Sequence, residues 1–329
     1  MEEKKVIWIT GASSGIGKAL AIKFAENGWL VAASARRENL LNELKKINQN
    51  IIPFPLDVTE IDSCKLVAKD IIKQFNNIDI CVFGTGMHDP KSEKRFNLDK
   101  IREIMEVNYF GTMNSINSIY DYFSEKKNGQ ISIISSVAGY RGLPAAGAYC
   151  ASKSALTSFA ESLNFDMQMK NVRVSLISPG FIKTPMTDQN DFPMPMIKTP
   201  EFAADEIYKG LVIKKGFEIH FPKAFTYFLK FLQMLPSSLY FEMKRVNVRV
   251  SLISPGFIKT PMTDQNDFPM PMIKSPEFAA EQIYIGLIKN KGFEIHFPKA
   301  FTFIMKTLRI LPSSWYFKIV EKGMKKIDY

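Results

Sequence analysis

The sequence has few of the residues that build metal centres and disulfide frameworks. Its 329 residues include three cysteines and three histidines. Cys64, Cys81 and Cys150 lie far apart, and no Cys-x-x-Cys pair is present. These absences argue against a zinc cluster and against a fold held by disulfides. We therefore expect reduced thiols and no bound metal.

Long apolar runs and blocks of like charge are also missing. Residues 1–6, Met-Glu-Glu-Lys-Lys-Val, carry charges where a secretory signal or leading membrane anchor would be apolar. The net charge of +10 comes from basic residues scattered along the chain, which favours a solvated surface over a nucleic-acid site. We expect a cytoplasmic protein that binds no nucleic acid.

Strand-like and helix-like segments alternate in the first part of the chain. Apolar, β-rich segments at residues 5–10, 29–34, 51–55 and 79–83 are separated by amphipathic, helix-like segments. The hydrophobic content of 46% is enough for a sizeable core. This pattern predicts an α/β fold with a doubly wound (Rossmann), mostly parallel sheet.

A glycine-rich turn follows the first of these segments. Gly11, Gly15 and Gly17 have the spacing Gly-x-x-x-Gly-x-Gly and precede a helical pattern. Glycines let the backbone approach a pyrophosphate closely, and a helix N-terminus supplies free N–H groups. The turn is therefore a candidate cofactor site, with an ordinary tight loop as the alternative.

Two basic residues follow the second expected strand. An acidic residue here would suit the ribose 2′-hydroxyl of NAD, whereas Arg36 and Arg37 suit the 2′-phosphate of NADP. The alternative is that both arginines belong to the exposed first turn of the next helix. We predict that NADP(H) is preferred over NAD(H).

Tyr149 and Lys153 form the strongest candidate pair for acid–base chemistry. They stand four residues apart in a segment expected to be helical over residues 148–169, so they share one face. A neighbouring ammonium favours the phenolate and should lower the pKa of Tyr149, which makes it a candidate general acid/base. Ser136 ends a β-rich run and could hydrogen-bond a substrate oxygen. For the pair alone, the alternative is a half-buried tyrosine beside a solvated lysine, and the other motifs of the chain favour the catalytic interpretation.

Together these motifs resemble those of the short-chain dehydrogenase/reductase family over roughly residues 4–225. The resemblance implies that Asn108, within Val-Asn-Tyr-Phe-Gly, holds a proton-relay water, and that Asp57 contacts the adenine. It implies that Ser136 holds a carbonyl oxygen, that Tyr149 protonates it, and that Lys153 binds the cofactor ribose. The residues expected at the cofactor are Gly11, Ser13, Ser14, Gly15, Ile16, Gly17, Arg36, Arg37, Asp57, Val58, Gly84, Thr85, Gly86, Tyr149, Lys153, Pro179, Gly180, Ile182 and Thr184.

One motif departs from the family pattern. The chain has Phe83-Gly84-Thr85-Gly86 where the family usually has Asn-Asn-Ala-Gly. The turn keeps its glycines but loses the side-chain amides that brace the sheet and touch the ribose. The departure puts the cofactor affinity in question rather than the type of reaction.

A segment rich in methionine and proline is a candidate substrate lid. Met186, Phe192, Met194 and Met196 are adaptable apolar side chains, which suit a bulky hydrophobic carbonyl or alcohol better than a sugar. The alternative is that they cap the core. His88 is assigned either to the substrate mouth or to a surface loop.

The most unusual feature is an internal repeat. Residues 171–198 recur without change at 247–274, and the match continues with substitutions to about residue 317. The repeat is too long and too nearly identical for a solenoid. We interpret it as a tandem duplication, with a catalytic domain at 1–246 and a duplicated copy of residues 171–246 at 247–329.

Only one copy can complete the sheet, and short connectivity favours the first. Two alternatives remain: the second copy displaces the first, or it inserts into a neighbouring chain. A pairing of its edge strand, Phe293–Phe297, with that of the first copy, Phe217–Phe221, would also protect the exposed edges. We expect a homo-oligomer, dimer or tetramer. The apolar tails at 224–235 and 300–311 are too short to span a bilayer, so either peripheral membrane contact or packing within the oligomer is expected of them.

The resemblance implies an NADP-dependent enzyme that moves a hydride between the nicotinamide and a hydrophobic ketone, aldehyde or secondary alcohol. The alternative function is an inactive cofactor-binding scaffold or interaction protein, produced if the repeat disrupts the lid.

Overall fold

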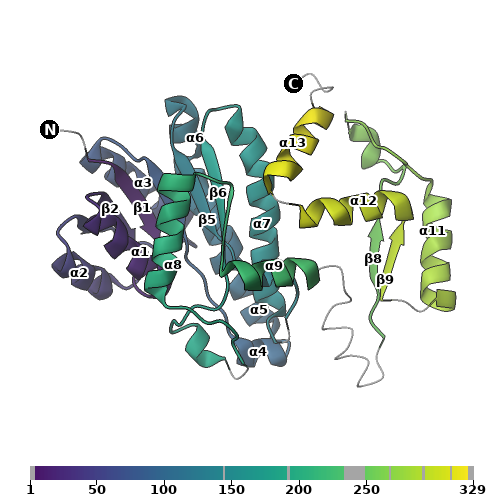
Figure 1. Ribbon diagram of the computed structural model, residues 1–329, viewed down its shortest axis with the longest axis horizontal. Coiled ribbons are helices and arrows are strands. Elements are labelled where there is room, and N and C mark those ends of the chain that lie inside the picture. Colours follow the sequence, from purple (N-terminus) through teal and green to yellow (C-terminus); the bar gives the residue numbers. More distant parts are fainter. Residues whose placement is uncertain are drawn as a thin grey trace. The chain divides into compact units, whose positions relative to one another are not determined.

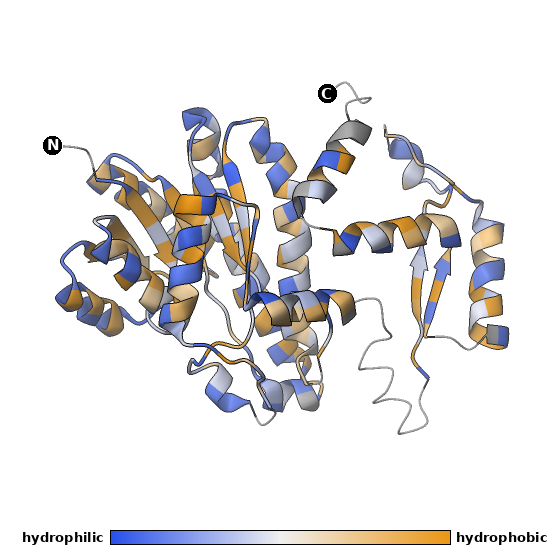
Figure 2. Cartoon of the chain, in the orientation of Figure 1, coloured by the Kyte–Doolittle hydropathy of each residue, from blue (hydrophilic) through white to orange (hydrophobic). Residues whose placement is uncertain are grey.

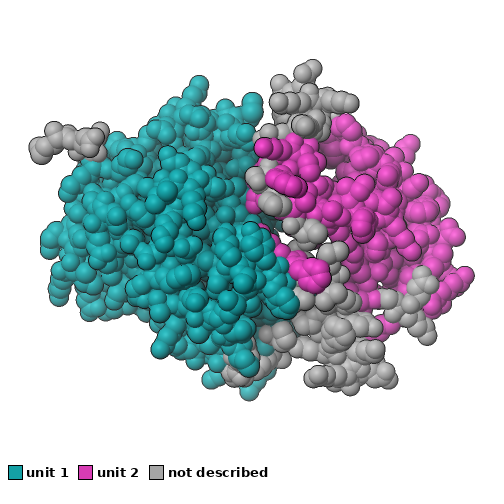
Figure 3. Space-filling model, in the orientation of Figure 1, with its two compact units in different colours: residues 1–229 teal, residues 230–329 magenta. Residues whose placement is uncertain are grey.

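The computed structural model describes residues 4–143, 145–190, 193–232, 249–266, 268–290, 293–311 and 313–324. The chain divides into two compact units, Met1–Leu229 and Lys230–Tyr329 (Figure 3). The proposed boundary between 246 and 247 stays a prediction.

A seven-stranded parallel sheet forms the centre of the first unit (Figure 1). Its strands are β1 (Val6–Thr10), β2 (Leu30–Ser34), β3 (Ile51–Pro53), β4 (Ile80–Phe83), β5 (Gln130–Ile134), β6 (Arg173–Pro179) and β7 (Glu218–Phe221). They lie in the order β3-β2-β1-β4-β5-β6-β7, and every neighbouring pair is parallel. The predicted doubly wound sheet is confirmed.

Helices cover both faces of this sheet because successive strand residues point to opposite sides. In β1, Ile7 and Ile9 pack into one core and Trp8 into the other. Figure 2 shows apolar residues concentrated in the strands and polar residues interspersed along the helices. The first core is covered by α1 (Gly15–Glu26), α2 (Glu38–Ile47) and α8 (Pro200–Tyr208), and the second by α3 (Ile61–Phe75), α6 (Gly111–Lys126) and α7 (Gly147–Gln168).

Shorter helical segments complete the first unit. The chain between β4 and α6 forms two helices and a π-helix, and three further short segments follow β5, β6 and α8. They are α4 (Pro90–Lys94), α5 (Leu98–Met105), the π-helix η1 (Glu106–Phe110), the 3-10 turns η2 (Val137–Gly139) and η3 (Thr187–Gln189), and the π-helix η4 (Lys209–Lys214), with α9 (Lys223–Leu232) after β7.

The strand order reverses between β1 and β4, and the loops that follow these strands touch. The N–H of Gly84 donates to Thr10 Oγ1 at 3.1 Å. A Cβ atom on Gly11 would lie 2.9 Å from the carbonyl oxygen of Gly84. In open parallel sheets, ligands bind in the crevice at such a reversal, beyond the carboxyl ends of the strands.

The second unit contains the repeated segment. β8 (Leu252–Pro255) pairs in parallel with β9 (Glu294–Phe297), and Leu252 lies opposite Glu294 as Leu176 lies opposite Glu218 in the first unit. The repeated sequences therefore fold into the same local structure. The other elements among the described residues of this unit are η5 (Thr263–Gln265), α11 (Pro276–Tyr284), η6 (Ile285–Asn290), α12 (Lys299–Ile310) and α13 (Ser313–Met324).

The two copies differ in their surroundings. β6 and β7 belong to the seven-stranded sheet, whereas β8 and β9 form a separate two-stranded sheet. Leu176 and its counterpart Leu252 are 2% and 50% exposed. The first copy therefore supplies strands to the sheet that carries the candidate site. The origin of the repeat by tandem duplication stays an interpretation.

Residues 224–232 and 300–310 of the two predicted tails are helical, within α9 and α12. None of the described helices combines the length and the apolar content needed to cross a bilayer. Peripheral membrane contact stays a prediction.

Candidate active site

A cavity of about 300 Å³ lies at the carboxyl ends of the central strands. It is lined by every residue that the sequence assigned to the cofactor, from six separate segments of the first unit. These are Gly11, Ser13, Ser14, Gly15, Ile16, Gly17, Arg36, Arg37, Asp57, Val58, Gly84, Thr85, Gly86, Tyr149, Lys153, Pro179, Gly180, Ile182 and Thr184, together with the predicted catalytic residue Ser136.

The glycine turn leads into the first turn of α1. Ser14 is the N-cap of this helix, but its side chain makes no capping hydrogen bond. Instead, Arg37 Nη2 donates to Ser13 Oγ at 2.9 Å and to Ser14 Oγ at 3.2 Å. The first N–H groups of a helix have no intrahelical acceptor, so this end offers donors and a favourable dipole to an anion.

Two glycines of the turn occupy places that a larger residue could not. A Cβ atom on Gly17 would lie 2.3 Å from the carbonyl oxygen of Gly11. Gly15 has a φ of +54°, and a Cβ there would lie 2.9 Å from Thr184 Cγ2. Because backbone and the Thr184 side chain approach these glycines closely and the turn lines the cavity, the residues present fit a dinucleotide pyrophosphate.

Arg36 lines the same cavity and lies beside Asp57. Arg36 Nη1 is 3.8 Å from Asp57 Oδ2, and the arginine side chain is 68% exposed. Asp57 is fixed by the N–H and the hydroxyl of Thr59, which donate to Oδ1 at 3.0 and 2.8 Å. An ion pair this long and exposed is weak, so the guanidinium can still bind another anion.

Tyr149 and Lys153 lie on the first turns of α7, as predicted. Lys153 is buried, its Nζ donates to the carbonyl oxygen of Ile134 at 3.0 Å, and it lies 5.7 Å from the centroid of the Tyr149 ring. Ser136 precedes η2, and its Oγ accepts the N–H of Ala138 at 3.1 Å. All three residues line the cavity, and the side chains of Ser136 and Tyr149 share a hydrogen bond.

The pKa values of this pair correct one expectation. Burial raises the pKa of the Tyr149 phenol to about 12, and a hydrogen bond with Ser136 opposes the rise. Burial also lowers the pKa of Lys153 to about 8. The expected lowering of the pKa of Tyr149 is therefore not found in this structure, because loss of solvent outweighs the hydrogen bond with Ser136. At neutral pH, Tyr149 is a phenol that can donate a proton.

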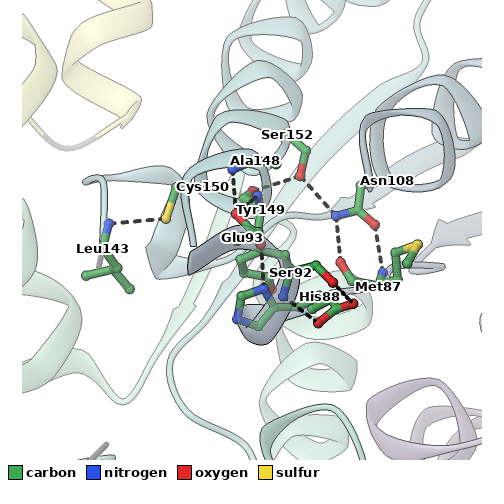
Figure 4. A network of polar contacts seen from close by, with 11 residues as sticks. Met87, His88, Ser92, Glu93, Asn108, Leu143, Ala148, Tyr149, Cys150 and Ser152 are labelled. Carbon is green, nitrogen blue, oxygen red and sulfur yellow. Dashed lines mark hydrogen bonds and ion pairs between the residues drawn. The ribbon is translucent and has the colours of Figure 1, made fainter. Parts of the chain in front are cut away.

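Asn108 does not line the cavity. It is fully buried in η1, where its Nδ2 donates to Met87 O and Ser152 Oγ, both at 3.0 Å, and its Oδ1 accepts the N–H of Met87 at 2.7 Å (Figure 4). Ser152 Oγ in turn donates to the carbonyl oxygen of Tyr149 at 2.7 Å. The amide thus connects the loop after β4 to the helix that carries Tyr149.

A second cavity, of about 80 Å³, lies beside Ser136 and Tyr149. Met186 lines both cavities, and its place at the substrate stays a prediction. Met194 and Met196 line neither, and Met196 is 49% exposed. Phe192 lies outside the described residues. A lid role for these three stays a prediction.

The sequence reasoning missed several residues of the site. Ala35, Leu56, Ile134 and Ser135 line the larger cavity from the ends of strands or just beyond them. The rule that ligands lie beyond the carboxyl ends of parallel strands could have found them. No sequence pattern indicated the contacts that His88 makes in the structure.

Comparisons with known proteins agree with this geometry. A family model described as short chain dehydrogenase matches residues 5–193. An uncharacterized oxidoreductase of Myxococcus xanthus is 33% identical over 236 residues, which is 70% of this chain and 93% of that protein. The 3-oxoacyl-acyl-carrier-protein reductase FabG of Thermotoga maritima is 32% identical over 191 residues, 57% of this chain and 78% of that protein.

A solved structure shows the same fold. The short-chain dehydrogenase of Burkholderia cenocepacia J2315, determined in complex with NADP, superposes with a TM-score of 0.61 at 23% sequence identity. The match covers 74% of this chain and 98% of that one.

Proposed function

The chain belongs to the short-chain dehydrogenase/reductase family of oxidoreductases, and from this premise we propose that it transfers a hydride between NADP(H) and a hydrophobic ketone, aldehyde or secondary alcohol. The observation that carries this proposal is the meeting of Ser136, Tyr149 and Lys153 in the cavity that also holds the glycine turn. The apolar lining of the smaller cavity, including Leu143, supports a hydrophobic substrate.

The cofactor, when bound, supplies or accepts the hydride. Ser136 Oγ holds the substrate oxygen by a hydrogen bond, and Tyr149 Oη donates the proton that completes the alcohol. Lys153 orients the cofactor ribose with its ammonium group. Asn108 holds the start of α7 in place for the proton path, because its amide bridges Met87 and Ser152.

The preference for NADP rests on Arg36 and Arg37, which both line the cavity. A titration followed by cofactor fluorescence should show NADPH binding at least about tenfold tighter than NADH, the worth of one charge-assisted hydrogen bond. A chain ending at residue 246 should bind NADPH equally well, because β6 and β7 come from the first copy.

Equal binding of NADH would contradict the assignment of the arginines. Loss of binding on truncation alone would mean that the second copy completes the site, with Pro255, Gly256 and Thr260 replacing Pro179, Gly180 and Thr184. The alternative function, an inactive cofactor-binding scaffold, requires NADPH binding without turnover of any carbonyl. We also propose a cytoplasmic homo-oligomer.

The pH dependence of carbonyl reduction should follow the ionisation of Lys153. Its ammonium is present below a pKa of about 8 and is lost above it, so kcat/KM for the carbonyl should fall as the pH rises through about 8. Tyr149 adds no limb in this range, because its pKa is about 12. The profile is measured from the initial rates of NADPH oxidation. In a Lys153→Arg variant, whose guanidinium stays charged, the residual activity should lack this limb; a limb that persists there would belong to another group.

A further inference from the structure

His88 and Glu93 form a buried pair beside Tyr149 (Figure 4). His88 Nδ1 lies 3.0 Å from Glu93 Oε1, and the two side chains are 8% and 2% exposed. His88 follows the Gly84–Gly86 turn, and Glu93 belongs to α4, which Asp89 begins by accepting the N–H of Ser92 at 3.1 Å. No step of the proposed mechanism uses either residue.

Glu93 binds the start of the helix that carries Tyr149. Its Oε2 accepts the N–H of Ala148 at 2.6 Å and lies 3.4 Å from the N–H of Tyr149. A buried carboxylate needs such donors, and the helix N-terminus supplies two of them. Its other oxygen is left for His88, so the imidazole is held in one orientation.

This contact determines which ring nitrogen of His88 remains available. A carboxylate only accepts hydrogen bonds, so Nδ1 must carry the proton that it shares with Glu93. Nε2 makes no hydrogen bond among the described residues. It can accept a hydrogen bond when the ring is neutral and donate one when the ring is protonated. A hydroxyl group can do both, and so it matches Nε2 in either state.

His88 also lines the smaller cavity, which we propose as the substrate site. Its ring centroid is 4.8 Å from that of Tyr149, with the planes inclined at 40°. It lines the smaller cavity together with Ser136 and Met186, and the remaining lining is mostly apolar, through Val137, Ala138, Leu143, Ala146 and Phe181. A polar nitrogen in such a wall gives specificity for one substrate group.

We propose that His88 binds a hydroxyl group next to the reacting carbonyl, with Glu93 as its positioning residue, so that the preferred substrate is a hydrophobic hydroxyketone or the corresponding diol. This inference rests on the proposed function and adds the substrate class.

The test compares acetophenone with α-hydroxyacetophenone, which differ by one hydroxyl. In the wild-type chain and in His88→Asn, we measure the ratio of kcat/KM for α-hydroxyacetophenone to kcat/KM for acetophenone. The amide N–H of the asparagine can still reach Glu93, but this side chain has no atom in place of Nε2. Comparing the ratio between proteins cancels the intrinsic reactivity of the two ketones. We expect the ratio to fall about tenfold in His88→Asn, the worth of one hydrogen bond.

A ratio unchanged within about twofold would overturn the inference while the proposed function stands. Failure of the wild-type chain to oxidise NADPH with either ketone would overturn both. Glu93→Gln serves as the second variant, because its amide replaces one acceptor oxygen by a donor and releases the His88 ring. The ratio should fall there too, whereas a purely structural role would lower both kcat/KM values equally.

Discussion

Replacing Tyr149 with Phe should lower kcat for carbonyl reduction by about a thousandfold, within the range that a positioned general acid contributes. The phenylalanine ring can still pack 4.8 Å from His88 and leaves the wall of the cavity in place. Only the hydroxyl that donates the proton is lost. The Kd for NADPH should therefore change by less than about twofold.

Tyr120→Phe is the matched control for this substitution. It removes a phenol hydroxyl that accepts a hydrogen bond from Lys170 Nζ at 3.0 Å, and Tyr120 lines neither cavity. Its kcat should stay within about twofold of the wild-type value. If Tyr149→Phe retained more than a tenth of the activity, Tyr149 would not be the proton donor.

Replacing Gly17 with Ala should weaken NADPH binding by about 10- to 100-fold. The added Cβ would lie 2.3 Å from the carbonyl oxygen of Gly11, and because the obstacle is backbone, either the turn or α1 must move. Forced shifts of this kind cost about 1–3 kcal/mol. The movement displaces the N–H groups that face the cofactor phosphates.

Gly216→Ala is the control, since a Cβ there meets no atom within 4 Å. Fluorescence titration gives the Kd, and a thermal melt of the same samples separates a damaged site from a damaged fold. Wild-type affinity in a folded Gly17→Ala variant would show that the cofactor does not rest on this turn.

The sequence predicted the sheet well because its signals are local. Residues 5–10 and 79–83 were expected as strands, and β1 and β4 cover Val6–Thr10 and Ile80–Phe83. The expected strand at 51–55 is shorter in the structure, where β3 ends at Pro53. Phe54 and Leu56 still donate to the carbonyl oxygens of Ala33 and Ala35 beyond this point, and β3 is an edge strand, which tolerates Pro53 and Pro55 although they have no backbone N–H.

The properties of the site were harder to predict because they depend on burial. The spacing of Tyr149 and Lys153 indicated that they share a helix face, but the direction of the pKa shift follows from the side chains packed around the phenol. The pair of His88 and Glu93 depends on α4, a five-residue helix whose contact with α7 joins residues 93 and 148.

The two copies of the repeat show which features depend on local sequence and which depend on burial by the surrounding elements. Residues 173–179 and 249–255 have the same sequence, and in both copies the strand pairs with its partner in the same register. Ile177 is nevertheless fully buried while Ile253 is 39% exposed. Local sequence selects the strand pair, whereas neighbouring strands and helices decide whether it belongs to a core.

The most direct test of hydride transfer uses NADPH labelled with deuterium at the transferable position of the nicotinamide. The wild-type chain is incubated with this cofactor and acetophenone or α-hydroxyacetophenone, and the alcohol is examined by mass spectrometry. The proposed mechanism predicts one deuterium on the carbinol carbon of the product, and almost no product with Tyr149→Phe. Tight NADPH binding with no labelled alcohol from either ketone would contradict it and favour the inactive scaffold.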